Sequence, residues 1–88
     1  MSVHGEFGRA LEQVIHALGA TTHARGEDWR ARLEGARLDR QPDLSSAARE
    51  ALAVSDEVAG SPDAERRVVD VADHLDRHCR VILGLPAR

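Results

Sequence analysis

The chain has 88 residues, and its 15 acidic and 12 basic side chains give a net charge of −3. This length builds one hydrophobic core, so we expect a single helical domain over residues 1–88. The acidic balance argues against a nucleic-acid-binding surface, which usually carries a basic footprint. All the bases are arginine, which together with abundant alanine and glycine indicates a GC-rich bacterial genome.

Hydrophobic residues at helical spacing predict a first helix over residues 3–20 and a short second helix over residues 27–38. In the first helix, Phe7, Leu11 and Leu18 fall on one face. The second helix begins with two acids, which the helix macrodipole favours there, and it has a narrow apolar stripe. Pro42 then interrupts the pattern, since a proline disfavours helical geometry in the residue before it.

A third helix is predicted over residues 44–59, with Asp43 or Ser45 as its N-cap. Its apolar face consists mostly of small side chains, so a neighbouring helix can approach closely. Ser55 lies in the middle of this face. We expect its hydroxyl to donate a hydrogen bond to the carbonyl of Ala51.

The fourth helix has the clearest boundaries. Ser61 is its expected N-cap and Pro62 its first residue, while Gly84 ends it in a left-handed conformation. Asp76 and Arg80 form an i,i+4 pair that we place on the solvated face. Together the four segments predict an all-α, antiparallel four-helix bundle with short connections. The expected core residues are Phe7, Leu11, Leu18, Trp29, Leu33, Leu52, Val68, Leu75 and Ile82.

This composition favours helices more than it supplies core volume. Hydrophobic residues make up 42% of the chain, 14 of them are alanine, and the only aromatics are Phe7 and Trp29. Alanine has the highest helix propensity but buries little area. We therefore expect the chain to gain further burial as a homo-oligomer, most simply a dimer, or as a small subunit bound to another protein.

The single cysteine, Cys79, cannot form an internal disulfide, which favours a reducing compartment. Charged residues interrupt the first helix too often for a signal peptide, and no stretch has the length to span a bilayer. We expect a cytoplasmic protein that does not bind a membrane.

Asp70, His74 and His78 are the most specific candidate site. Their i, i+4, i+8 spacing stacks them in one column, where two imidazoles can bind one divalent metal ion and Asp70 can orient His74. Cys79 points about 100° away from His78, so a single chain offers too few ligands. We favour the structural interpretation, in which His74 forms a hydrogen bond with Asp70, His78 caps the edge of the core and no ion is bound. A dimer that pairs two copies of this helix could instead assemble a site of four histidines.

Glu12, His16 and His23 form a second column if the first helix continues past Gly19. The segment His16-Ala17-Leu18-Gly19-Ala20 resembles the phosphorylated-histidine motif of phosphotransfer four-helix bundles. This resemblance implies that His16 accepts a phosphoryl group. The basic residue that those domains carry before the glycine is missing here, which puts the phosphotransfer activity in doubt.

Arg67 and His74 also resemble the Arg-x(4–6)-His spacing of helical nuclease toxins, although apolar Val68 stands where that family has a polar residue. Phosphate-binding loops, Cys-x-x-Cys and His-Glu-x-x-His motifs are absent from the sequence. No nucleophile has an evident activating partner. We therefore expect a noncatalytic interaction or regulatory module without an organic cofactor. The alternatives are a metal-binding bundle that uses His74 and His78, and a phosphotransfer domain that uses His16.

Overall fold

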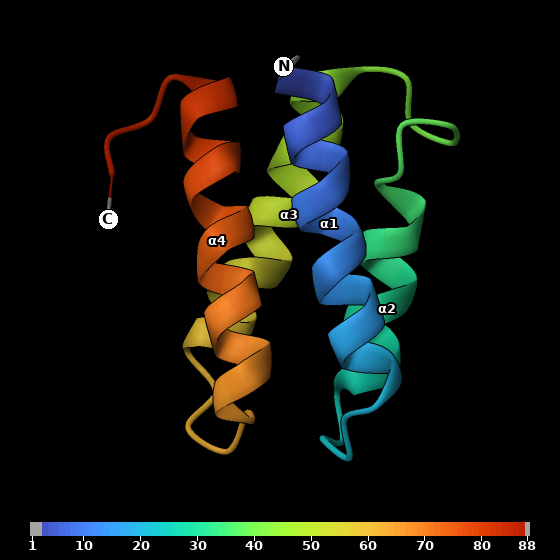
Figure 1. The fold of residues 1–88 in the computed structure, drawn as a ribbon, viewed down its shortest axis with the longest axis vertical. Helices are drawn as coiled ribbons and strands as arrows, with labels where there is room; N and C mark the ends of the chain where they lie inside the picture. Colours follow the sequence, from blue (N-terminus) through green and yellow to red (C-terminus); the bar gives the residue numbers. More distant parts are fainter. Residues whose placement is uncertain (1–2, 88) are drawn as a thin grey trace.

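A computed structural model describes residues 3–87 as four helices: α1 (Val3–Gly19), α2 (Gly26–Gly35), α3 (Leu44–Ala59) and α4 (Arg66–Leu83). Helices make up 72% of the structure, and no strand occurs within residues 3–87. Successive helices run in opposite directions, so that α1 begins and α4 ends at the same end of the bundle (Figure 1). The predicted all-α antiparallel four-helix fold is confirmed.

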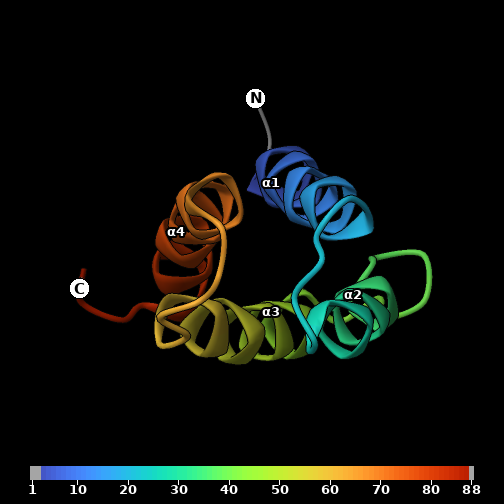
Figure 2. The ribbon, with the colours of Figure 1, turned by 90° about the horizontal axis from the view of Figure 1, so that it is seen from below.

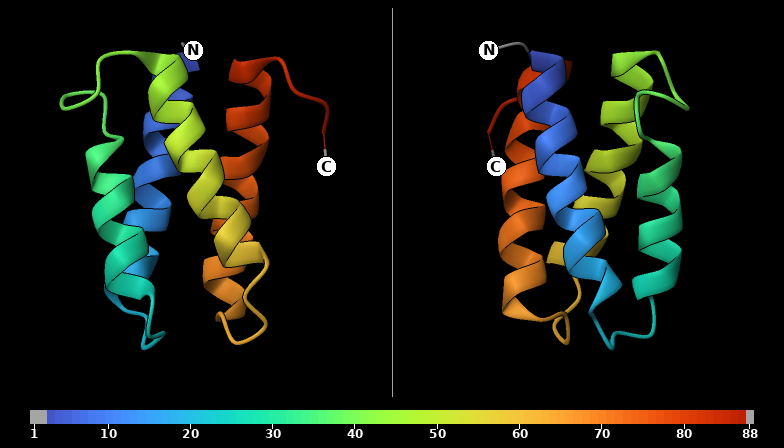
Figure 3. Two further views of the ribbon diagram at one scale, coloured as in Figure 1. Left: turned by 180° about the vertical axis from the view of Figure 1, so that it is seen from behind. Right: turned by 45° about the vertical axis from the view of Figure 1, so that its right-hand side comes forward.

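The four helices form a ring in the order of the chain (Figure 2). Each helix packs against its neighbours in sequence, and α4 closes the ring by packing against α1. The α3–α4 and α1–α4 interfaces are the most extensive, and the smallest contact between neighbouring helices is that of the short α2 with α3. Figure 3 shows that α3 is inclined to α2. Because α4 takes part in both of the most extensive interfaces, it contributes most to the packing of the bundle.

The core combines a few large side chains with many alanines. Phe7, Trp29 and Leu75 are fully buried, and the inner face of α3 consists largely of alanine and valine. These small residues let neighbouring helices approach closely, as predicted. Of the expected core residues, only Leu52 and Ile82 are partly exposed, because they lie at the edge of the core.

Three local predictions about helix ends and interiors are confirmed. The carboxylate of Asp43 caps α3 by accepting a hydrogen bond from the backbone N–H of Ser46 at 3.2 Å. The hydroxyl of Ser55 donates to the Ala51 carbonyl at 2.9 Å. Gly84 ends α4 in the left-handed region, with a φ of 68°.

The predicted start of α4 is wrong. Ser61 and Pro62 belong to a turn, closed by a hydrogen bond of 3.1 Å from the Ala64 N–H to the Ser61 carbonyl, and the helix begins only at Arg66. Contacts with the α1–α2 loop hold this segment outside the helix: Thr21 donates to Glu65, and His23 pairs with a carboxylate of the turn. These tertiary contacts override the local N-terminal signal.

The other helix boundaries differ less from the prediction. The helix α2 ends at Gly35, before the predicted residue 38, and the chain then forms turns up to residue 40. The helix α1 ends one residue early, at Gly19, and α3 has the predicted bounds. Within residues 3–87, no helix combines the length and the apolar character that a membrane span needs.

Candidate functional site

The outward side of α4 contains the predicted histidine pair. We call the surface formed by His74, Arg77, His78 and Val81 the α4 outer face. It lies outside the buried stripe of the same helix, Val68, Ala72, Leu75 and Cys79, with His78 at the boundary between the two. His74 is exposed and His78 half-buried, while Val81 is 76% exposed. Two imidazoles and one large apolar side chain therefore share a solvent-facing surface.

The two histidine rings contact each other edge to face. Their centroids are 4.7 Å apart and their planes meet at 86°. Asp70, the third predicted member of the site, pairs with Arg66 at 3.6 Å, and no hydrogen bond links it to His74 within residues 3–87. The expected Asp70–His74 hydrogen bond is therefore wrong. The described part of the chain holds no group of three or more His, Cys, Asp or Glu side chains placed to bind a metal ion.

The environment of His74 favours its neutral form. Burial lowers the pKa of His74 from 6.5, and the neighbouring His78 and Arg77 lower it further. Because the pKa of His74 lies below 6.5, its imidazole is mostly uncharged at neutral pH. An uncharged imidazole keeps a free ring nitrogen, which is the form that binds metal ions or accepts a phosphoryl group.

Cys79 and Asp76 lie inside the bundle instead of on the outer face. Burial, together with the nearby carboxylate of Asp76, raises the pKa of the Cys79 thiol to about 12, so the thiol is protonated at neutral pH. The expected i,i+4 pair of Asp76 with Arg80 is confirmed at 2.7 Å, but its solvated position is wrong because Asp76 is only 3% exposed. It faces α3, where Arg80 also approaches Asp56 at 3.7 Å.

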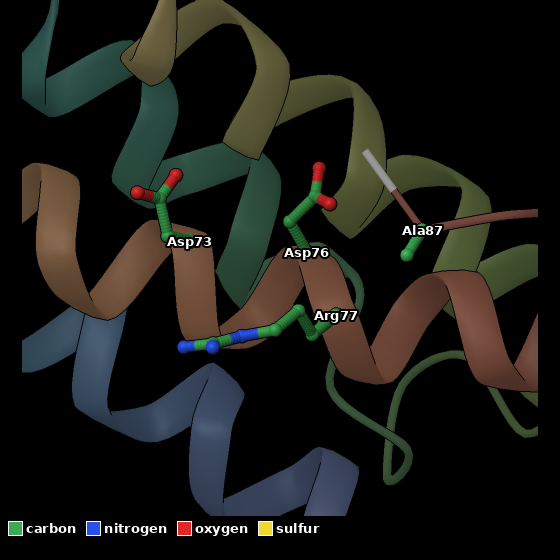
Figure 4. Close-up of a pocket in the computed structure, with 4 residues that line it drawn as sticks. All are labelled: Asp73, Asp76, Arg77 and Ala87. Atoms are coloured by element: carbon green, nitrogen blue, oxygen red, sulfur yellow. The ribbon is translucent and has the colours of Figure 1, made fainter.

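A small pocket lies where the C-terminal segment passes α4. Its volume is about 290 Å³, and its walls are Asp73, Asp76, Arg77 and Ala87. In Figure 4 the two carboxylates project to one side of α4, while the Arg77 side chain runs to the other side. Arg80 donates to the Pro86 carbonyl at 3.3 Å and so fixes the segment beside the helix. The pocket is therefore a consequence of how the chain end is held.

An apolar groove lies between α3 and the end of α4. It encloses about 430 Å³, and Leu52, Leu83 and Leu85 form its apolar walls. Arg49 and Asp56 of α3 line the same groove. Leu85 is 44% exposed. Apolar walls with one charge of each sign suit contact with another polypeptide better than they suit a small polar ligand.

A polar cluster around Trp29 was not predicted from the sequence. The indole N–H donates to Glu57 at 3.3 Å, the ring of His23 stacks on Trp29 at 4.6 Å, and Arg25 lies over the indole at 5.6 Å. The Glu57 carboxylate also pairs with Arg25 and Arg32, at 2.7 Å each. The one sequence signal was a lone tryptophan, whose buried N–H needs an acceptor.

The charges of this cluster are mutually satisfied. Arg32 donates to Glu50 at 2.8 Å as well as to Glu57, and these two hydrogen bonds raise its pKa. The Arg32 hydrogen bond is also the main reason why the pKa of Glu57 lies below its ordinary value. Because each charge already has a partner, we interpret the cluster as a brace that holds α2 against α3.

The second predicted histidine column does not form. The helix α1 ends at Gly19, so His23 lies in the loop that follows. The ring of His23 stacks on Trp29, and its Nε2 contacts the carboxylate of Asp63 at 2.9 Å. Glu12 pairs instead with Arg37 at 3.1 Å. His16 is exposed near the end of α1, which is the position that a phosphoryl acceptor needs.

Arg67, the arginine of the nuclease-like spacing, is used within the fold. Its guanidinium donates to the carbonyls of Ala17 and Ala20 at 3.3 and 3.1 Å. These carbonyls end α1, where a cation is favoured by the helix dipole. Arg67 therefore links the start of α4 to the end of α1.

No protein-family model, curated protein or solved structure matches this chain.

Proposed function

We propose that the chain is a noncatalytic helical interaction module, acting as a homo-oligomer or as a small subunit bound to another protein. The observation that supports it is the position of the exposed apolar side chains. Within residues 3–87 the large hydrophobic residues that remain exposed are Val3, Val81 and Leu85. All three lie at the end of the bundle where α1 begins and α4 ends (Figure 1).

Single exposed apolar residues are common, whereas a contiguous exposed apolar surface is characteristic of contact sites. The groove formed by Leu52, Leu83 and Leu85 lies beside the same end of α4. Covering these residues would add burial to a core in which alanine replaces larger side chains. The proposal places the protein in a bacterial cytoplasm, which agrees with a buried, protonated thiol at Cys79.

Sedimentation velocity with a chelator present tests the homo-oligomer. Val81→Glu places a charge in the proposed contact and should shift the chain toward monomer. Ala31→Glu is the matched control, because Ala31 is an exposed position on α2, away from this end of α4. Equal effects of both substitutions would contradict the assigned surface. A wild-type chain that stays monomeric in chelator at high micromolar concentration would remove a metal-independent homo-oligomer.

A further inference from the structure

The α4 outer face combines a pair of contacting histidines with an exposed apolar side chain. The rings of His74 and His78 contact each other, and Val81 stands three residues further along the same face of the helix. Val81 is the most exposed of the large hydrophobic residues within residues 3–87. The carboxylate one turn before His74 belongs to Asp70, which pairs with Arg66.

We propose that His74 and His78 form half of a divalent transition-metal site, which a second copy of the chain completes with the same two histidines across a twofold axis. The inference rests on the proposed interaction module and deepens it, because it names the partner as a second copy and the link as a metal ion.

The ligand type and spacing determine the class of ion. Imidazole nitrogen suits Zn²⁺, Cu²⁺ and Ni²⁺, whereas Mg²⁺ and Ca²⁺ require oxygen donors. Residues four apart on a helix have Cβ atoms about 5–6 Å apart, so both rings can turn one nitrogen toward a common point. The ring centroids of His74 and His78 are already 4.7 Å apart. Because His74 is exposed, its ring can turn without disturbing the core.

The number of ligands determines the need for a partner. A closed zinc site takes four protein donors, and the described part of one chain offers no group of three. A twofold contact uses the same patch on both copies, so it doubles the histidine pair and brings the two Val81 side chains into one interface. The ion supplies the directional bonds and the valines supply apolar contact.

The test uses the full-length chain without a polyhistidine tag. Sedimentation velocity is recorded with chelator, with ZnCl₂ and with CoCl₂, whose visible spectrum distinguishes tetrahedral from octahedral Co²⁺. We expect Zn²⁺ to shift the chain from monomer toward dimer at one ion per two chains, and Co²⁺ to show the tetrahedral spectrum. The His74→Ala/His78→Ala double variant should lose both effects.

His16→Ala is the matched control, since His16 is an exposed histidine on α1 and should leave both effects intact. Circular dichroism checks that each variant is folded. If the double variant unfolds, His74→Ala alone gives the same test, because the side chain it removes is exposed.

The outcomes separate this inference from the proposed function. A dimer that persists in chelator and in the double variant overturns the metal site and keeps the interaction module. Zn²⁺ bound to a monomer, or dimerisation by Zn²⁺ that survives the double variant, also overturns the shared site. A chain that stays monomeric with and without Zn²⁺ overturns the metal site together with the homo-oligomer.

Discussion

Leu75→Ala should be among the most damaging substitutions in this protein. Leu75 is fully buried in the middle of α4, the helix that packs against both α1 and α3. The substitution removes three buried carbon groups at about 0.8 kcal/mol each, or about 2.4 kcal/mol. The cavity left behind raises the total cost into the range of about 2–5 kcal/mol. A chain of this size has a total stability of only about 4–13 kcal/mol.

Urea denaturation followed by circular dichroism measures this loss as a lower midpoint at unchanged slope. A loss of about 3 kcal/mol corresponds to a fall in Tm of roughly 12–24 °C. Leu85→Ala is the matched control, because it makes the same change at a side chain that is 44% exposed. It should cost less than about 0.5 kcal/mol at low protein concentration. Equal losses at both positions would refute the assignment of Leu75 to the core.

Three other predictions follow from local features. Cys79 should not react with thiol reagents at neutral pH until urea unfolds the chain, because its thiol is buried and its pKa is raised to about 12. Labelling of the native protein at the rate of a free thiol would contradict this prediction. Glu57→Gln should cost about 1 kcal/mol near neutral pH. The folded-state pKa of Glu57 lies below its ordinary value of 4.5. The stabilisation is therefore complete above pH 4.5 and is lost as the pH falls below that value. The urea midpoints of wild type and variant should converge in acid. Gly84→Ala should destabilise by about 1–2 kcal/mol because residue 84 has a positive φ. In contrast, Gly8→Ala should stabilise by about 0.5–1 kcal/mol, since a Cβ there meets no atom within 4 Å; effects of the same sign would contradict these assignments.

The features that could be predicted from the sequence depend on local physics. Apolar spacing was enough to find α1 and α3, and glycine chemistry placed the end of α4 at Gly84. The start of α4 was wrong because Glu65 and Asp63 bind residues of another loop, 44 and 40 positions earlier in the chain. No local signal reports such contacts.

The candidate site was only partly predictable for the same reason. Helical periodicity correctly placed His74 and His78 side by side and Cys79 in the core. It could not show that Asp70 pairs with Arg66 and that Asp76 faces α3, since both depend on which neighbours surround α4. The Trp29 cluster draws carboxylates from α3, so it becomes visible only once the helices are packed.

Native mass spectrometry of the protein purified from its own host tests the interaction module most directly. The mass of the intact complex reports a homo-oligomer, a bound partner subunit and a retained metal ion in one spectrum. We expect a dimer or a stoichiometric complex with another protein, weakened by Val81→Glu and unaffected by Ala31→Glu. A bare monomer, with the exposed Val81 and Leu85 covered by nothing, would contradict the proposed function.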